Sequence, residues 1–210
     1  MSYDVALARM AQLQSLFTPA ATVAPATVPA AAATAPAATT PTAFASQLQS
    51  ASAATMTPAP APTSAGQTIV NLVKNEVGVA EQPPGSNDSP RIAQFRQATA
   101  GSGVGPWCAY FTSWAAREAG VPLGDNGQGF GRVDDVYAWA QKAGKAVPNT
   151  GGDVKPQPGD LIVWDEHIGI VESVGADGAV STIEGNSSDS VARRSYGADG
   201  GGAIGYVRLG

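Results

Sequence analysis

The chain of 210 residues contains one cysteine, Cys108, and one histidine, His167. A single cysteine cannot form an internal disulfide, so cysteine content does not indicate an oxidising or a reducing compartment. One histidine and one cysteine among scattered carboxylates also do not provide the clustered ligands that zinc prefers. We therefore expect no metal and no other cofactor in this protein.

Charged residues are missing from a long N-terminal stretch. None occurs between Arg9 and Lys74, and half of the 16 prolines lie in this stretch among Ala, Thr and Ser. Such a sequence has few large apolar side chains to bury and too many prolines for a helix. We expect residues 18–65 to form a disordered Ala/Pro/Thr-rich linker. The net charge of −5 at pH 7 then belongs to residues 66–210, which have the size of a single domain.

Long basic runs and long apolar runs are both absent from the sequence. We therefore expect neither nucleic acid nor a membrane as a partner. Residues 1–4 do not begin a basic segment followed by an apolar core, so we expect no ordinary secretory signal. Residues 1–17 carry a short amphipathic pattern, which is typical either of a frayed tail or of a docking segment for a protein partner.

The remaining sequence changes from helical patterns to strand patterns. Helices are predicted at 67–79, 90–95, 108–118 and 133–143, and strands at 160–164, 167–174, 180–186, 192–196 and 204–209. Ser89 is the predicted N-cap of the second helix, and Pro90 its first residue. Helices followed by a meander of short strands predict an α+β fold, with N-terminal helices packed on one small antiparallel sheet.

Cys108 falls where one of these helices is expected to begin. Pro106 suits the start of a helix because it has no amide hydrogen to leave unpaired, and apolar residues follow at helical spacing. A thiol in the first helical turn lies near the positive end of the helix dipole and near free backbone N–H groups, and both stabilise a thiolate. This position indicates a cysteine hydrolase; a buried structural cysteine is the alternative.

His167 is expected to begin a strand, and the next strand contains two candidate partners for it. Gly169 leaves room for a close neighbour, for which the Cys108 helix is the expected occupant. Successive side chains of a strand point to opposite faces, so Glu184 and Asn186 are expected on one face of the following strand. If the two strands pair, either side chain is able to accept the imidazole N–H and orient the ring, as the third member of a catalytic triad does. A solvated strand-end charge is the alternative for Glu184.

Four segments together resemble the CHAP family of cysteine- and histidine-dependent amidohydrolases/peptidases, which occurs in phage and bacterial peptidoglycan hydrolases. They are residues 106–109, 158–161, 167–171 and 183–186, and residues 81–87 resemble the lead-in of the family. The resemblance spans residues 67–208 and implies a papain-like fold. It also implies that Cys108 is the nucleophile, His167 the general base, and Glu184 with Asn186 the orienting groups.

Two further site expectations accompany this resemblance. Trp107 and Tyr110 flank the cysteine and are expected to line the substrate cleft. The acidic calcium-binding cluster that some members place before the cysteine is missing, since residues 101–105 hold no carboxylate. We therefore expect no calcium requirement.

The resemblance implies hydrolysis of an amide bond in cell-wall peptidoglycan, by an amidase or an endopeptidase. Two alternatives remain: a non-catalytic wall-binding or assembly module, flagellar or phage, on the same fold, and a cysteine enzyme that acts on another amide. Residues 8–14 and 44–49 are similar to the leader of some flagellum-associated wall hydrolases, which would allow export without a signal peptide. We expect a monomer that is secreted or acts in the cell envelope, or that accumulates in the cytoplasm until release.

Overall fold

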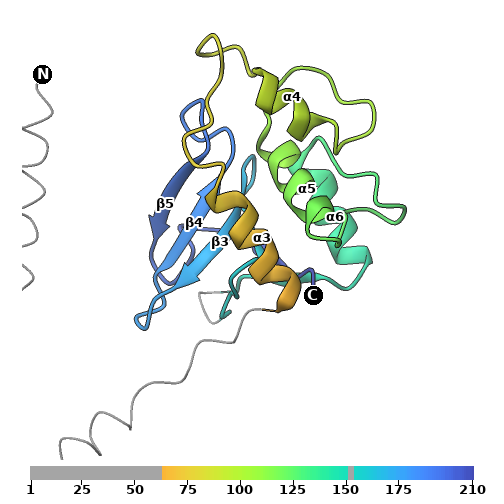
Figure 1. The fold of residues 1–210 in the computed structure, drawn as a ribbon. Helices are drawn as coiled ribbons and strands as arrows, with labels where there is room; N and C mark the ends of the chain where they lie inside the picture. Colours follow the sequence, from red (N-terminus) through yellow and green to blue (C-terminus); the bar gives the residue numbers. More distant parts are fainter. Residues whose placement is uncertain (1–62, 151–153) are drawn as a thin grey trace, which may run out of the picture. The chain divides into compact units, whose positions relative to one another are not determined.

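The computed structural model describes residues 63–150 and 154–210. The amphipathic segment predicted at residues 1–17, and nearly all of the linker predicted at 18–65, lie outside these described residues. Within them the chain forms four helices and a six-stranded antiparallel sheet, which confirms the α+β fold (Figure 1).

The four helices precede the sheet in the sequence. They are α3 (Ser64–Lys74), α4 (Pro90–Arg96), α5 (Cys108–Glu118) and α6 (Val133–Lys142). Helix α3 begins earlier than the 67–79 predicted, because the side chain of Thr63 caps it by accepting a hydrogen bond from Gly66 N at 2.9 Å. It also ends earlier, at Lys74. Ser89 caps α4 in the same way, through Ile92 N at 3.3 Å, as its sequence predicts.

The strands form one sheet in the order β1-β6-β2-β3-β4-β5. Their bounds are Ala146–Pro148 (β1), Leu161–Val163 (β2), Ile168–Val174 (β3), Val180–Glu184 (β4), Ala192–Tyr196 (β5) and Gly205–Val207 (β6). The five predicted strands are confirmed, four of them with shorter ends, and β1 is an additional one. The last strand of the chain, β6, lies inside the sheet, between β1 and β2.

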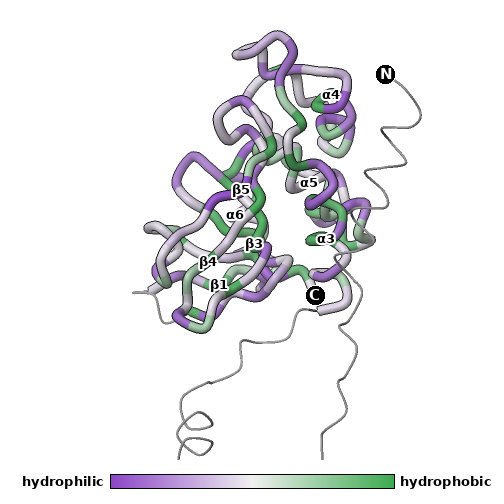
Figure 2. Tube along the Cα trace, turned by 60° about the vertical axis from the view of Figure 1, so that its left-hand side comes forward, coloured by the Kyte–Doolittle hydropathy of each residue, from purple (hydrophilic) through white to green (hydrophobic). Residues whose placement is uncertain are grey.

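The helices pack beside one face of the sheet (Figure 1), and hydrophilic segments lie mainly in the outer loops (Figure 2). Helix α5 is the most buried helix, with nine of its 11 residues shielded from solvent. Its aromatic residues pack against α4: Phe95 lies 5.2 Å from Phe111 and 4.9 Å from Trp114 between ring centroids. Such pairs stabilise the core beyond the area that they bury, and they fix α5 against α4.

None of the helices in the described ranges is both long enough and apolar enough to cross a membrane.

Candidate active site

Cys108 is the first residue of α5, as the sequence predicts, and only 5% of its surface is exposed. Trp107 occupies the N-cap position, and within the described residues its side chain makes no capping hydrogen bond to the first turn. The first backbone N–H groups of the helix are therefore available to an oxygen atom that reaches them, and the helix dipole adds a positive potential at the same place.

Gly185 allows α5 to approach the end of β4. A Cβ atom at this position would lie 2.6 Å from the Cβ of Phe111 and 2.9 Å from Cζ3 of Trp107, which is closer than real carbon atoms pack. The close approach was expected at Gly169 instead, and that expectation is wrong. The space beside Gly169 holds the side chain of Glu184, whose Cγ would lie 2.6 Å from an added Cβ.

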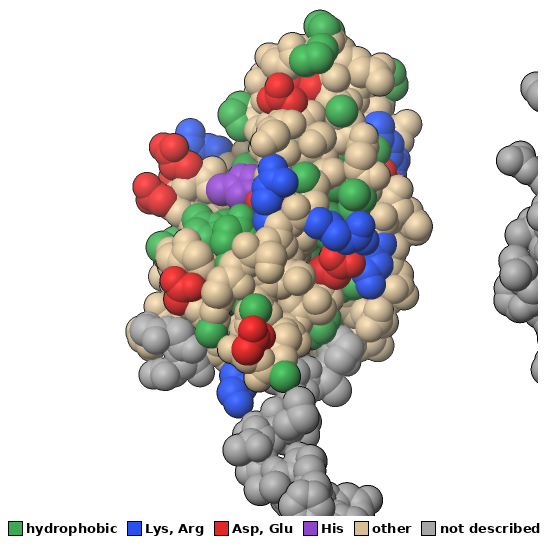
Figure 3. All heavy atoms as spheres, turned by 90° about the vertical axis from the view of Figure 1, so that its left-hand side faces the viewer, with side chains coloured by type: hydrophobic (Ala, Val, Ile, Leu, Met, Phe, Trp, Pro, Cys, Tyr) green, Lys and Arg blue, Asp and Glu red, His purple; other side chains and the backbone are tan. Residues whose placement is uncertain are grey.

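His167 lies directly before β3, in the turn that joins it to β2. Its Nε2 is 2.9 Å from Oε2 of Glu184, at the end of the adjacent strand β4. Because a carboxylate only accepts hydrogen bonds, Nε2 carries the proton in this contact, and Nδ1 is the nitrogen left for Cys108. The imidazole is about 30% exposed, whereas the Glu184 side chain is 2% exposed. Figure 3 shows the histidine (purple) reaching the molecular surface among hydrophobic and charged side chains.

Glu184 is held by two more donors besides His167. The hydroxyl of Thr182 donates to its Oε1 at 2.6 Å, and the hydroxyl of Tyr196 donates to the same oxygen at 2.9 Å. Trp164 stacks on the imidazole at 5.7 Å and contacts Tyr196 in a tilted arrangement at 5.1 Å, both between ring centroids. The carboxylate and the imidazole are therefore fixed in orientation from several sides.

These contacts change the protonation of the pair. Burial lowers the pKa of His167, but hydrogen bonding to Cys108 and to Glu184 outweighs burial and raises that pKa from 6.5 to about 9. Burial raises the pKa of Glu184, but its hydrogen bonds from His167, Thr182 and Tyr196 outweigh burial and lower it. Burial and the bond to Glu184 raise the pKa of Tyr196 to about 12. At neutral pH the site therefore contains an imidazolium between a carboxylate and the cysteine sulfur.

Asn186 does not share a strand face with Glu184, contrary to the sequence prediction. Strand β4 ends at Glu184, and Asn186 has a φ of +57°, so the chain turns away after Gly185. With its amide oriented to match its partners, the oxygen accepts from Trp107 N at 3.2 Å and the nitrogen donates to Glu81 Oε1 at 3.3 Å. Asn186 is thus bound to the segment that precedes the cysteine, and Glu184 is the residue that contacts His167.

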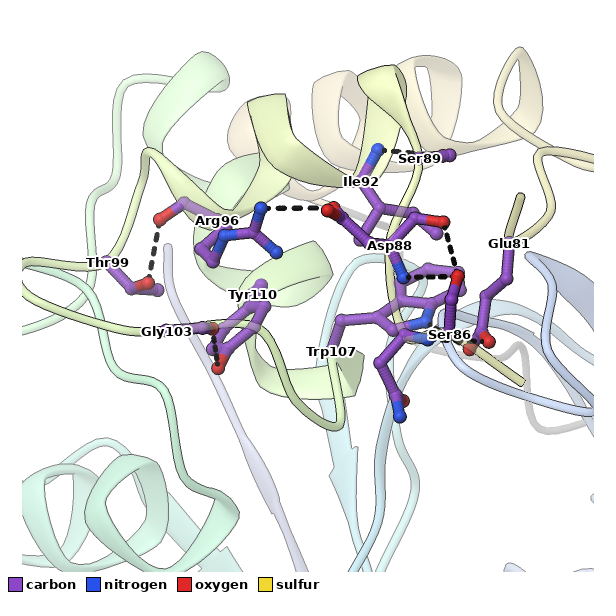
Figure 4. A network of polar contacts seen from close by, with 11 residues as sticks. Glu81, Ser86, Asp88, Ser89, Ile92, Arg96, Thr99, Gly103, Trp107 and Tyr110 are labelled. Atoms are coloured by element: carbon purple, nitrogen blue, oxygen red, sulfur yellow. Dashed lines mark hydrogen bonds and ion pairs between the residues drawn. The ribbon is translucent and has the colours of Figure 1, made fainter. Parts of the chain in front are cut away.

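A cleft of about 500 Å³ opens at Cys108. Its lining residues are Pro106, Cys108, Tyr110, Gly131, Arg132, Val133, Asp134, Asp165 and Glu166. Tyr110 therefore lies where the sequence placed it. The prediction for Trp107 is wrong: this side chain is fully buried, stacks on Phe95 at 6.1 Å, and donates its indole N–H to Glu81 at 2.9 Å (Figure 4).

Residues 99–186 match the family model of the CHAP domain. Over these residues the chain is similar to a CHAP domain. The match includes Cys108, His167, Glu184 and Asn186, and it confirms the family that the four sequence segments resemble. No curated protein matches the chain. CHAP domains in general are hydrolytic, as amidases or peptidases, and are associated with peptidoglycan hydrolysis.

Three groups around Cys108 and His167 were not predicted from the sequence. Thr182 lies two residues before Glu184 on the same strand face, a position that alternation alone indicates. Tyr196 and Trp164 reach the site from β5 and from the end of β2, so their roles depend on a strand register that the sequence does not show. Within residues 63–150 and 154–210, no group of three or more His, Cys, Asp or Glu side chains is placed to hold a metal ion.

Proposed function

We propose that this protein is a cysteine-dependent peptidoglycan hydrolase of the cell envelope, which cleaves an amide bond of the wall peptide. The observation that carries the proposal is that His167 faces Cys108 while its Nε2 is bound to the buried carboxylate of Glu184. A nucleophile, a base next to it and a third group that orients the base are the parts that covalent amide hydrolysis needs.

In the proposed reaction, the sulfur of Cys108 attacks the carbonyl carbon of the scissile amide. The carbonyl oxygen becomes negatively charged and accepts a hydrogen bond from the backbone N–H of Cys108, at the free start of α5. His167 then gives its proton to the leaving amine, and the carbon–nitrogen bond breaks to leave a thioester. A water molecule, deprotonated by His167, attacks the thioester and releases the acid and the thiolate.

Glu184 has an electrostatic role in this scheme. Its lowered pKa keeps it ionised, and it accepts three hydrogen bonds, so it stabilises the imidazolium without taking its proton. The buried carboxylate also supports catalysis over a purely binding role. A module that only binds the wall has no need to hold a charged carboxylate, at a desolvation cost, against a histidine that faces a thiol.

The test is hydrolysis of purified sacculi by the parent protein and by Cys108→Ala and Cys108→Ser, with the melting temperature as a check on folding. We expect the parent to solubilise sacculi and both variants to lose this activity, because the chain has no second thiol. Solubilisation by Cys108→Ala at the parent rate would contradict the proposal.

Mass spectrometry of the released fragments distinguishes the bonds. An amidase separates the stem peptide from the glycan, and an endopeptidase leaves part of the peptide on it. A deamidase, in contrast, releases ammonia from a wall that stays insoluble.

A further inference from the structure

Glu81 is a buried carboxylate that the proposed mechanism does not use. It lies in the loop between α3 and α4, and only 3% of its surface is exposed. Oε1 accepts from the indole N–H of Trp107 at 2.9 Å and from the amide of Asn186 at 3.3 Å, and Oε2 accepts from the backbone N–H of Asn87 at 2.8 Å. Burying a carboxylate is costly, so three donors directed at it indicate that its position matters.

Glu81 holds Trp107 at two points. The first is the direct bond to the indole N–H. The second runs through Asn186, whose amide oxygen accepts from the backbone N–H of Trp107 at 3.2 Å. Figure 4 shows Glu81 beside the ring of Trp107. A side-chain anchor and a backbone anchor together restrict rotation of the residue as well as its position.

Trp107 precedes the nucleophile, so its orientation determines the direction of the next peptide group. That peptide carries the backbone N–H of Cys108, the donor assigned above to the developing oxyanion. Asn186 also links this segment to the end of β4, two residues after Glu184. The hydrogen bonds of Glu81 therefore connect the helix start that carries the nucleophile to the strand that carries the partner of the base.

We propose that Glu81 is a positioning residue that acts through Trp107 and Asn186 to direct the Cys108 backbone N–H at the oxyanion of the transition state. The inference rests on the proposed function, because it takes Cys108 as the nucleophile. Two effects at Cys108 are then separate. His167 and Glu184 act on the sulfur, whereas Glu81 determines how well the backbone N–H of Cys108 stabilises the carbonyl group under attack.

Two small probes distinguish these effects without any peptidoglycan. With 4-nitrophenyl acetate, the sulfur attacks the ester carbonyl, an oxyanion develops, the ester C–O bond breaks, and 4-nitrophenolate leaves behind an acetyl thioester. With iodoacetamide, the sulfur displaces iodide from a CH₂ group, and no oxyanion forms. Only the first reaction requires a correctly directed N–H donor, whereas both require the thiolate.

Glu81→Gln keeps the size of the side chain. Whichever way its amide turns, either Trp107 or Asn87 faces an NH₂ group in place of an acceptor. We expect the rate constant of the acylation burst with 4-nitrophenyl acetate to fall about 10- to 100-fold. The rate of iodoacetamide alkylation should stay within about twofold of the parent across the pH range, because the thiolate–imidazolium pair is unchanged.

The matched control is Asp88→Asn, which removes a carboxylate from the same loop. Asp88 pairs with Arg96 at 3.0 Å, so this variant should keep both rates. Trp107→Phe removes the indole N–H together with part of the buried ring, and it should lower acylation in the same direction, by a smaller factor, because the backbone anchor through Asn186 remains. It tests the inference independently if Glu81→Gln does not fold.

Acylation of folded Glu81→Gln at the parent rate would overturn the inference, as would equal losses of acylation and alkylation. A lower melting temperature with both rates unchanged at 25 °C would reduce Glu81 to a structural role and overturn it too. So would a parent protein without a Cys108-dependent burst. Since neither probe contains wall peptide, a parent that acylates but leaves sacculi intact contradicts the proposed function alone.

Discussion

Replacement of Glu184 by Gln tests how the imidazole is charged. The variant keeps the shape of the side chain but removes the negative charge beside His167. In the parent, the pKa of His167 is raised from 6.5 to about 9 even though burial opposes the rise. That difference corresponds to about 3 kcal/mol in favour of the imidazolium, shared between Cys108 and Glu184. Losing the carboxylate should remove the part that Glu184 supplies and move the pKa of His167 back toward 6.5.

The alkaline side of the pH dependence of activity should move in this variant. The proposed reaction uses imidazolium to protonate the leaving amine, so activity in the parent is lost as pH rises through about 9. In Glu184→Gln this alkaline limb should move to lower pH. Alkylation at Cys108 should change over the same pH range, because the imidazole that titrates there is hydrogen-bonded to the cysteine.

Two measurements report these changes: the pH–rate profile on sacculi, and the pH dependence of iodoacetamide alkylation at Cys108. Glu172→Gln is the matched control, since Glu172 lies on β3 and pairs with Arg193 at 2.8 Å, outside the site. Asn186→Ala should change activity with little effect on the alkaline limb, because its amide contacts Glu81 and Trp107. If Asn186→Ala displaced the pH profile of alkylation while Glu184→Gln left it in place, the assignment of Glu184 as the partner of His167 would be refuted.

Protein stability gives an independent measure of the same pair. A raised pKa for His167 contributes stability that is complete below pH 6.5 and is lost as pH rises through about 9. The lowered pKa of Glu184 contributes stability above pH 4.5 that is lost as pH falls through its value in the folded protein. The difference in melting temperature between the parent and Glu184→Gln should therefore be largest between these limits, at about pH 4.5–6.5.

Two other changes test how the fold builds the site. Gly169→Ala places a methyl group in contact with Glu184. We therefore expect at least a tenfold loss of activity on sacculi and a loss of about 1–3 kcal/mol in the free energy of unfolding, measured by chemical denaturation. Full activity would show that the carboxylate has room to move. A chain beginning at Thr63 should keep the parent melting temperature. One beginning at Gly66 loses the cap of α3, so its free energy of unfolding should be about 1 kcal/mol lower. Equal stabilities of the two chains would show that the cap contributes nothing.

The sequence predicts those parts of the fold and site that depend on local pattern. The start of α5 at Cys108 follows from Pro106 and the helical spacing after it, and the approach of β3 to β4 follows from two alternating segments. Glu184 was one of two predicted partners for His167. Choosing between them required the backbone at Asn186, where a positive φ reverses the direction of the side chain. Alternation rules assume that a strand continues, so they fail where it ends.

The remaining differences concern contacts between distant segments. Tyr196 reaches Glu184 only because β5 pairs with β4 in one particular register. Trp107 looks like an exposed aromatic residue beside a nucleophile, and it is buried because Glu81, in a different loop, accepts its indole N–H. Neither relation leaves a periodic signal in the sequence. Both depend on the packing of elements that the sequence predicts individually but does not place.

The position of β6 has a consequence for how the sheet is assembled. Strands β1 and β2 follow one another in the sequence but do not pair with each other; β6 lies between them and pairs with both. Strand β1 therefore joins the sheet only through a strand that lies far along the chain, and such non-local pairing is slow to form. Removal of Gly205–Val207 should detach β1 from the sheet as well, although the sequence of β1 itself is unchanged.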